Sequence, residues 1–434
     1  MTAQELLAKI DQKSVVVGVL GLGYVGLPLA VTFARNGVTV LGFEKSEEKT
    51  AKVNAADNYI ADVEDAELKA VTEAGTLSAT TDFSRIKECD AAIICVPTPL
   101  DRFKKPDLSY VEGAAREIGM RMKPGTFVCL ESTTFPTTTE NILKPILESE
   151  SGLACGEGFF LAYSPERVDP GNKNWKTENT PKVVGAMSED GLEIAMKLYG
   201  TAVKTLHPVS SPRIAEMVKI LENTYRLVNI SLMNELALLA GKMEIDIWEV
   251  IEAAKTKPYG FQAFYPGPGI GGHCIPLDPF YLEYIAKDYA FELSMIHTAG
   301  HIDLLMPHRM TIKITSALNR HKKSVNGAKI LFLGVAYKPD IADERESPAL
   351  KIMDEVIGKG GQVAYYDPYV PAVTTPQGHS LVSNPSVSGI EGYDIVVVST
   401  RHTSVDYAAV ADSAQLLVDL QNAYSYSSDR IYKL

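Results

Sequence analysis

The chain has 434 residues and a net charge of −12, and 46% of its residues are hydrophobic. This length predicts two or three domains, and the apolar content is sufficient for buried cores. The acidic balance argues against binding to nucleic acid or to an anionic membrane surface, although local basic pockets can still hold phosphates. The five cysteines are odd in number and irregularly spaced, so we expect no disulfide framework.

A glycine-rich turn near the N-terminus is the first informative feature in chain order. Residues 14–20 predict a strand, Gly21-Leu22-Gly23-Tyr24-Val25-Gly26 opens a helical pattern that ends near residue 36, and a second strand over 39–43 ends in Glu44. This order of strand, glycine turn, helix and acidic residue is typical of a dinucleotide site. The helix N-terminus would hold the pyrophosphate, and Glu44 would bind the ribose hydroxyls, which favours NAD over NADP.

Residues 14–34 carry no charge and are long enough to span a membrane. Four glycines and Pro28 within this run, together with the strand that follows, favour a globular domain instead. A signal peptide is not expected, because Glu5 and Asp11 precede the run and no cleavage pattern follows it. We therefore expect a cytoplasmic protein.

Strand and helix patterns alternate up to about residue 205, which predicts a parallel sheet covered by helices. We expect strands at 91–96, 126–130, 159–163 and 202–205, and a helix over 110–122. Cys95 and Cys129 lie inside the strand patterns and should be small buried side chains. The turns at 95–99, 131–136 and 163–167 follow strand ends, so they should line one crevice.

A helical block begins at Ser211-Pro212 and is expected to continue to about residue 254 with apolar residues on nearly every face. Such a helix is usually buried between domains or in a dimer. Lys219 and Asn223 are four residues apart and share one face. Taken alone, they would be interpreted as an ordinary exposed polar pair.

The loop over 266–279 surrounds Cys274 with glycine and proline. Proline restricts the backbone and glycine allows a ligand to approach closely, so the pattern indicates a nucleophilic thiol. A metal site is not expected, since His273 and Cys274 are adjacent and lack a CxxC or HxxxH partner. His273 itself is expected to pack or to form hydrogen bonds rather than to act as a base.

A third block begins near residue 326. It predicts strands over 329–335, 362–366, 395–399 and 416–419, with a helix ending at 358. This pattern is a second doubly wound unit without the glycine fingerprint.

Seven motifs in this order, GLGYVGLPLA, CVPTP, ESTTFP, YSPE, KILEN, GGHCIPLD and YKPDIADERESP, resemble the UDP-glucose/GDP-mannose dehydrogenase family over nearly the whole chain. The resemblance implies an α/β fold of two Rossmann-like doubly wound domains joined by a long central helical segment. The implied division is an NAD-binding domain at 1–209, a dimerisation segment with the cysteine loop at 210–325, and a UDP-sugar-binding domain at 326–434.

The family oxidises a sugar C6 alcohol to a carboxylate with two NAD per turnover, through a cysteine thioester. The resemblance implies catalytic roles for Cys274, Lys219, Asp278, Glu166, Thr134 and Asn223. It implies NAD contacts from Gly21, Gly23, Tyr24, Val25, Gly26, Glu44, Pro97, Thr98, Thr134 and Arg345. It implies substrate contacts from Glu166, Lys219, Asn223, Tyr265, Gly271 and Lys338.

The form of the cysteine loop is most similar to the branch that acts on UDP-N-acetylglucosamine. His273, Leu277 and Pro258 stand where the UDP-glucose branch typically has serine, lysine and an arginine that reaches across the dimer. UDP-N-acetylgalactosamine, UDP-N-acetylmannosamine and UDP-glucose stay open as substrates. A two-electron dehydrogenase of the β-hydroxyacid type and a silent nucleotide-sugar-binding protein are more remote alternatives.

Overall fold

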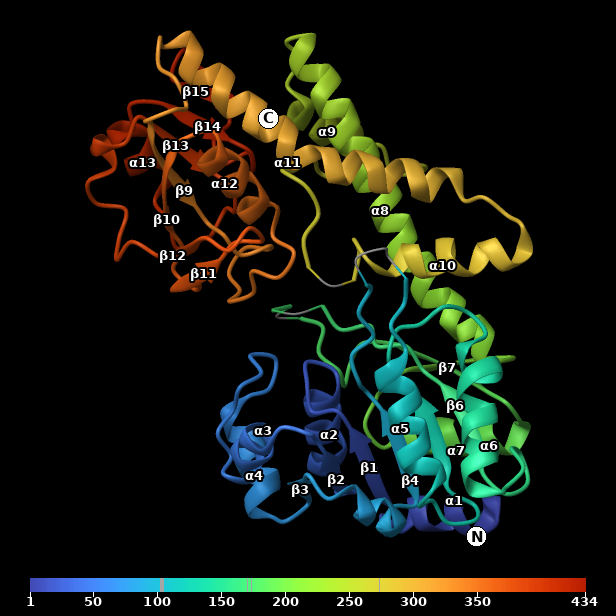
Figure 1. Cartoon of the computed structure of the whole chain (residues 1–434). Coiled ribbons are helices and arrows are strands. Elements are labelled where there is room, and N and C mark those ends of the chain that lie inside the picture. Colours follow the sequence, from blue (N-terminus) through green and yellow to red (C-terminus); the bar gives the residue numbers. More distant parts are fainter. Residues whose placement is uncertain (102–104, 170, 173, 273) are drawn as a thin grey trace. The chain divides into compact units, whose positions relative to one another are not determined.

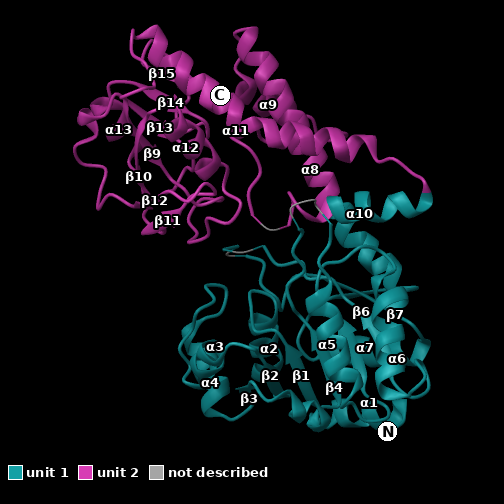
Figure 2. Cartoon of the chain, in the orientation of Figure 1, with its two compact units in different colours: residues 1–222, 280–289 teal, residues 223–279, 290–434 magenta. Residues whose placement is uncertain are grey.

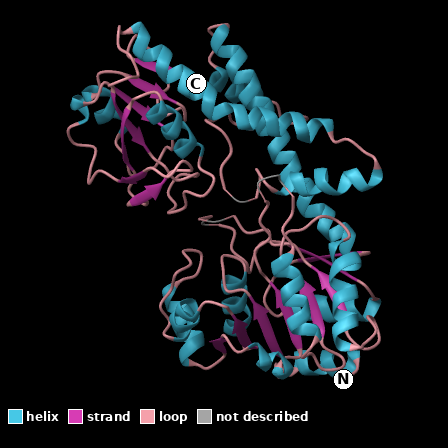
Figure 3. Cartoon of the chain, viewed as in Figure 1, coloured by secondary structure: helices cyan, strands magenta, loops and turns pink. Residues whose placement is uncertain are grey.

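The computed structural model describes residues 1–101, 105–169, 171–172, 174–272 and 274–434 (Figure 1). The chain divides into two compact units, residues 1–222 with 280–289 and residues 223–279 with 290–434 (Figure 2). Helices alternate with strands in both units, and each unit has its own main sheet (Figure 3). The predicted fold class, two doubly wound α/β domains and a long central helix, is confirmed.

Unit 1 contains an eight-stranded sheet in the order β3-β2-β1-β4-β5-β6-β7-β8. Its strands are β1 (Val16–Leu20), β2 (Thr39–Phe43), β3 (Leu77–Thr80), β4 (Ala91–Ile94), β5 (Phe127–Leu130), β6 (Phe160–Tyr163), β7 (Lys182–Ala186) and β8 (Leu206–Val209). Neighbouring strands are parallel except β6 and β7, which are antiparallel. The strand order reverses between β1 and β4, and a ligand crevice is expected at this point, beyond the carboxyl ends of the strands.

Helices cover both faces of this sheet. They are α1 (Ala3–Asp11), α2 (Gly26–Arg35), α3 (Glu47–Asn54), α4 (Asp65–Glu73), α5 (Ser109–Gly119), α6 (Lys144–Ser151) and α7 (Glu189–Gly200). Alternate residues of β1 enter different cores, because side chains of a strand point to opposite faces. Val17 and Val19 pack with side chains of α1, α2 and α7, whereas Leu20 packs with those of α5 and α6. The uncharged run 14–34 therefore forms a buried strand and a buried helix.

The predicted strand at 202–205 is wrong. The N–H groups of Ala202 and Val203 donate to the main-chain oxygen of Tyr199, so these residues form the turn that ends α7, and β8 begins at Leu206. Ala202 and Val203 are buried in the core beneath α7. Their apolar character reflects that packing and not a strand.

The helical block is also interrupted where one helix was predicted to continue to about residue 254. Helix α8 (Pro212–Lys242) ends before Glu244, which has a φ of +58°, and α9 (Ile247–Lys255) begins after Asp246. The Asp246 side chain accepts hydrogen bonds from the N–H groups of Trp248 and Glu249, which caps the new helix. Among the described residues, no helix combines the length and the apolar character that a membrane crossing requires.

Unit 2 contains a five-stranded parallel sheet in the order β10-β9-β13-β14-β15. The strands are β9 (Lys329–Leu333), β10 (Gln362–Tyr366), β13 (Ile395–Val398), β14 (Leu417–Asp419) and β15 (Ile431–Lys433), and a small hairpin joins β11 (Ala372–Thr374) to β12 (Ser380–Val382). The other helices are α10 (Asp278–Ala286), most of which belongs to unit 1, and α11 (Ser294–Arg320), α12 (Pro348–Gly358) and α13 (Tyr407–Ser413) in unit 2. The strand order reverses at β9, which places a second expected crevice at the carboxyl ends of β10, β9 and β13.

Candidate active site

The glycine turn between β1 and α2 has the geometry that a dinucleotide site needs. Gly21 has a φ of +93°, and a Cβ there would lie 2.7 Å from the main-chain oxygen of Cys95. A Cβ at Gly26 would lie 1.8 Å from the oxygen of Gly21, whereas a Cβ at Gly23 would meet no atom within 4 Å. The first and third glycines are therefore required by packing. The second leaves open space near the N-terminal end of α2, where a phosphate fits.

Glu44 lies at the end of β2 and is bonded to the glycine turn. Its Oε2 accepts a hydrogen bond from the N–H of Leu22 at 3.1 Å, and its Oε1 accepts one from the N–H of Ser46 at 3.1 Å. The Tyr59 hydroxyl donates to the main-chain oxygen of Leu22 at 2.7 Å. Burial and the nearby charge of Glu44 raise the pKa of Tyr59 to about 12. The Tyr24 side chain is 45% exposed, so it is accessible beside the turn.

The turns after β4 and β5 are joined by hydrogen bonds, as their strand-end positions predict. Thr98 Oγ1 donates to the main-chain oxygen of Thr133 at 2.7 Å, and Ser132 Oγ donates to that of Val96 at 2.6 Å. Pro97 is exposed next to Thr98. Thr134 is fully buried, and its Oγ1 has no hydrogen-bond partner among the described residues. A buried hydroxyl of this kind is suited to hold a water or a ligand atom.

A buried polar cluster that the sequence did not predict lies at the end of β5. Lys182 Nζ donates to Glu131 Oε2 at 2.8 Å, and the Tyr199 hydroxyl donates to Glu131 Oε1 at 2.5 Å. Burial raises the pKa of Glu131, and the ion pair with Lys182 opposes that shift. Lys182 Nζ also lies 3.4 Å from the main-chain oxygen of Pro165, which precedes Glu166. The cluster therefore links the turns after β5 and β6.

Unit 1 brings Glu166 and Lys219 together. Lys219 Nζ donates to the main-chain oxygen of Glu166 at 2.7 Å, and Lys219 is only 8% exposed. Oε1 of Glu166 accepts hydrogen bonds from the N–H groups of Arg167 and Val168, at 2.7 and 2.6 Å. Arg167 itself pairs with Glu222 on α8. The alternative interpretation of Lys219 as an ordinary exposed side chain is therefore wrong.

Unit 2 connects Asn223, Asp278 and Cys274. Asn223 Nδ2 donates to Asp278 Oδ2 at 2.5 Å, and both side chains are buried. The main-chain oxygen of Cys274 accepts hydrogen bonds from the N–H groups of Leu277 and Asp278, at 3.2 and 2.8 Å. Cys274 is therefore held at the turn that begins α10, and it is exposed, unlike Cys95 and Cys129, which are buried as predicted. His273 lies outside the described residues.

The glycine loop packs against the segment after β9. A Cβ at Gly271 would lie 2.5 Å from Tyr337 Cβ, and the N–H of Gly272 donates to the main-chain oxygen of Arg345 at 3.0 Å. The Arg345 guanidinium forms a two-point ion pair with Asp343. Lys338 follows Tyr337 directly and is half-buried. Three predicted substrate and cofactor contacts, at 271, 338 and 345, therefore lie in one part of unit 2.

Tyr265 packs on α9. Its ring is stacked on Trp248 with centroids 5.7 Å apart, and its hydroxyl donates to Glu252 Oε1 at 2.7 Å. Lys255 Nζ lies 3.3 Å from the same hydroxyl. The side chain is 38% exposed, so one part of the ring remains accessible.

Comparison with known families matches three consecutive segments of the chain. The NAD binding domain of the UDP-glucose/GDP-mannose dehydrogenase family matches residues 15–203, its central domain residues 213–303, and its UDP binding domain residues 331–426. The chain belongs to the UDP-glucose/GDP-mannose dehydrogenase family. It is an NAD-dependent nucleotide-sugar 6-dehydrogenase, an oxidoreductase, and its substrate is a UDP-sugar.

Similar proteins agree along nearly their whole length. The UDP-N-acetyl-D-glucosamine 6-dehydrogenase of Pseudomonas aeruginosa is 35% identical over 394 residues, which cover 90% of this chain and 91% of that protein. The UDP-N-acetyl-D-mannosamine dehydrogenase of Pyrococcus horikoshii is 37% identical over 412 residues, with 94% and 95% coverage. The solved structure of a UDP-D-ManNAc dehydrogenase from Pyrococcus horikoshii has a TM-score of 0.88 and 36% identity, and it covers 96% of this chain and 98% of its own.

The cofactor of this dehydrogenase is NAD, and the turn after β1 fits it. Gly21 and Gly26 shape the turn and Gly23 leaves the space, while Val25 occupies the position before α2. Each carboxylate oxygen of Glu44 uses one lone pair for a main-chain N–H, which leaves acceptor capacity for ribose hydroxyls.

Sequence reasoning missed Glu216, which lies one turn before Lys219 on α8. Glu216 is fully buried and accepts hydrogen bonds from the N–H groups of Thr137 and Thr139, at 2.6 and 2.9 Å, and from Thr139 Oγ1 at 2.7 Å. Burial raises the pKa of Glu216 to about 7. The spacing of 216, 219 and 223 at helical intervals is the signal that could have identified it.

Proposed function

We propose that this dehydrogenase oxidises the C6 hydroxyl of UDP-N-acetylglucosamine to the uronic acid in a four-electron reaction that supplies surface-polysaccharide precursors. The observation that carries the four-electron reaction is the exposed Cys274 thiol, held at the start of α10 in a glycine loop. The name of the Pseudomonas aeruginosa relative supports the acetamido sugar. The Pyrococcus horikoshii relative is named for the mannosamine epimer, so UDP-N-acetylmannosamine, UDP-N-acetylgalactosamine and UDP-glucose are the alternatives.

The proposed chemistry divides between the cofactor and the protein. The glycine turn, Glu44, Thr98 and Arg345 would hold NAD, which would accept the hydride in each of the two oxidations. The Cys274 thiolate adds to the C6 aldehyde, which gives a thiohemiacetal, and remains bonded to C6 as a thioester after the second oxidation. A water then cleaves the thioester and releases the carboxylate. A cysteine is required because its thiolate is a strong nucleophile and a good leaving group.

Other side chains have proposed roles around the same carbon. Lys219 carries a charge that stabilises the developing alkoxide, and Asn223 donates a hydrogen bond to it. Glu166 acts on the hydrolytic water. Thr134 has a buried hydroxyl without a partner among the described residues, which suits it to hold that water. Asp278 fixes the Asn223 amide through the hydrogen bond at 2.5 Å.

Substrate contacts are proposed for the side chains at 166, 219, 223, 265, 271 and 338. We also propose the division of the chain into an NAD-binding domain at 1–209, a central segment at 210–325 and a UDP-sugar domain at 326–434.

We propose that the enzyme acts in the cytoplasm, because a reactive thiol must stay reduced and the cytoplasm keeps thiols reduced.

We propose that the active species is a dimer in which the unit 2 part of α8 packs against a second copy. Large apolar side chains on this part are exposed, between 38% and 53%: Tyr225, Leu232, Leu236 and Leu239. An apolar helix face of this length is usually covered by another helix. Light scattering at assay concentration tests this, and an active monomer would refute it.

A panel of UDP-sugars with measured NADH yield and product mass tests the function. We expect two NADH per sugar and a uronic acid, with the highest kcat/KM for UDP-N-acetylglucosamine. One NADH per sugar would indicate a two-electron alcohol dehydrogenase, and no NADH would indicate a silent binding protein. A higher kcat/KM for another sugar would correct the substrate without changing the chemistry.

A further inference from the structure

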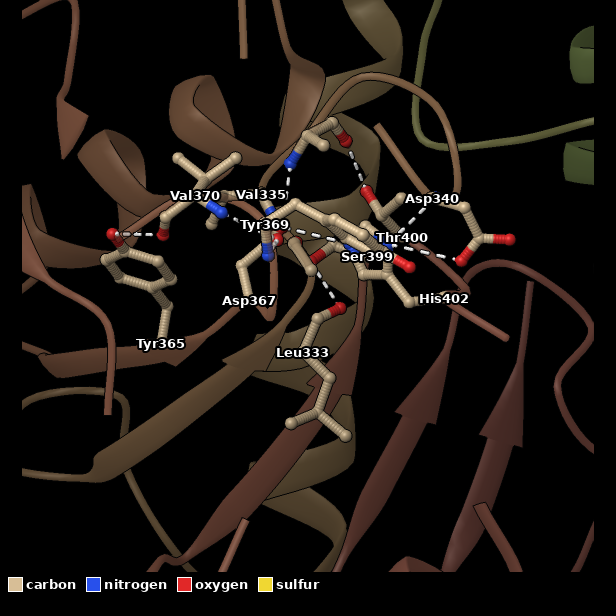
Figure 4. A network of polar contacts seen from close by, with 12 residues as sticks. Leu333, Val335, Asp340, Tyr365, Asp367, Tyr369, Val370, Ser399, Thr400 and His402 are labelled. Atoms are coloured by element: carbon tan, nitrogen blue, oxygen red, sulfur yellow. Dashed lines mark hydrogen bonds and ion pairs between the residues drawn. The ribbon is translucent and has the colours of Figure 1, made fainter. Parts of the chain in front are cut away.

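A buried carboxylate, that of Asp367, lies at the carboxyl ends of β10, β9 and β13 in unit 2. Asp367 follows β10, and its Oδ2 accepts hydrogen bonds from the N–H groups of Val335 and Ala336, at 2.7 and 3.0 Å, and from His402 Nε2 at 2.9 Å (Figure 4). Its Oδ1 accepts hydrogen bonds from the N–H groups of residues 369 and 370. Burial alone would raise the pKa of Asp367, but these hydrogen bonds lower it, so the carboxylate is ionised.

His402 uses both ring nitrogens in this network. It follows β13 and is fully buried. Its Nδ1 accepts the main-chain N–H of Asp340 at 3.0 Å, and its Nε2 faces Asp367. Because a main-chain N–H can only donate, Nδ1 carries no proton, and the ring proton is assigned to Nε2 from its carboxylate partner. His402 is therefore an acceptor toward Asp340 and a donor toward Asp367.

Residues 336–340, the segment that carries Lys338, are hydrogen-bonded at both ends to the pair of Asp367 and His402. Its beginning is held by Asp367 through Ala336, and its end is held by His402 through Asp340. Asp340 has a φ of +61°, a left-handed conformation that costs free energy in a residue with a Cβ, although less in aspartate than in most others, so local hydrogen bonds help to hold it. The hydrogen bond from its N–H to His402 is one such restraint, and the bond from the N–H of Thr403 to Asp340 Oδ1 is another.

We propose that His402 is a positioning residue for nucleotide-sugar binding, which sets the conformation of the segment carrying Lys338 and so the affinity for the UDP-sugar. This inference rests on the proposed function, in which Lys338 contacts the substrate. No chemical step involves His402, so its loss should raise KM for the UDP-sugar more than it lowers kcat. The KM for NAD should stay unchanged.

Two substitutions separate the two hydrogen bonds of the ring. His402→Asn places an amide oxygen near the position of Nδ1 and can still accept from the Asp340 N–H. His402→Gln extends an amide nitrogen toward the position of Nε2 and can still donate to Asp367. We expect KM for the UDP-sugar to rise roughly tenfold in His402→Gln, because a part-buried N–H loses its acceptor, and about two- to threefold in His402→Asn.

A double-substitution cycle with Lys338→Ala distinguishes positioning from a general loss of stability. If His402 acts through Lys338, His402→Gln should cause little further increase in KM once Lys338 is removed. His379→Asn is the matched control, because His379 also pairs with a carboxylate, Asp354, at 2.9 Å in the same unit. This control should retain wild-type kcat and KM.

The decisive measurements are UDP-N-acetylglucosamine kinetics and calorimetric titration with UDP on the full-length protein. Weaker UDP binding in His402→Gln than in His402→Asn, at similar melting temperatures, supports the inference. Equal effects of the two variants, or a full His402→Gln effect that persists in the Lys338→Ala background, would overturn it. If the wild-type protein oxidises no UDP-sugar, the proposed function fails, and the UDP titration still tests the positioning role separately.

Discussion

Replacement of Glu44 by glutamine tests how the cofactor is selected. Each oxygen of the Glu44 carboxylate already accepts one main-chain N–H, from Leu22 and from Ser46, both at 3.1 Å. The remaining lone pairs are the acceptors proposed for the two adenosine ribose hydroxyls. Glutamine keeps the shape of the side chain but removes the charge, and its amide nitrogen must face one of the two N–H donors.

The expected magnitude follows from these contacts. A hydrogen bond to a charged acceptor is worth about 1 kcal/mol more than one to a neutral acceptor, so two ribose bonds lose about 2 kcal/mol. This loss corresponds to a roughly 30-fold fall in kcat/KM for NAD. The amide nitrogen of the glutamine would also face a main-chain N–H, of Leu22 or of Ser46, and this contact between two donors should lower kcat/KM further. For NADP, the loss of the carboxylate charge removes a repulsion with the 2′-phosphate, so the preference for NAD over NADP should narrow by at least the same factor.

The assay is initial-rate kinetics with both cofactors at saturating UDP-sugar. Lys45→Gln is the matched control, because Lys45 is the exposed neighbour of Glu44 and its loss should change the cofactor ratio by less than about threefold. A Glu44→Gln variant with wild-type KM for NAD and undiminished rejection of NADP would refute the assignment of Glu44 to the ribose.

Further substitutions test the chemistry and the pH dependence of stability. Cys274→Ala should abolish release of uronic acid while calorimetry still detects NAD and UDP binding, and wild-type product formation would rule out the thioester. Cys274→Ser should trap an ester that intact-mass spectrometry detects after incubation with NAD and substrate. Lys219→Ala should reduce kcat by roughly 10²–10³, and a near-normal kcat would remove Lys219 from the mechanism. Folding raises the pKa of Glu216 to about 7. The stability that Glu216 contributes is therefore fully present at pH values below the pKa that it has in the unfolded chain, and it is lost as the pH rises toward 8. The free energy of unfolding of unit 1, measured by hydrogen exchange, should therefore decrease by about 3 kcal/mol between pH 4.5 and 8, and Glu216→Gln should largely remove this decrease. An unchanged dependence of the free energy on pH in that variant would contradict this.

The local sequence was sufficient to predict the fold class and the glycine turn. The alternation of strands and helices depends on side-chain period, which neighbouring residues determine, so most strands were predicted within a few residues. The turn at Gly21 was predictable because only glycine accepts its φ of +93° without strain. The predicted helix to residue 254 failed because Asp246 starts a new helix, and the predicted strand at 202–205 failed because burial under a helix also requires apolar residues.

Tertiary structure alone decided which polar side chains meet. Glu131 pairs with Lys182 although 51 positions separate them, and Asp340 reaches His402 across 62 positions. Neither pair has a periodic signal, because each joins residues from strands that are distant in the chain. Glu131 follows β5 and Lys182 begins β7, which runs antiparallel to β6, whereas Asp340 lies in the segment after β9 and His402 follows β13. The sequence by itself determined where most of the turns begin, and the sheet determined which turns became neighbours.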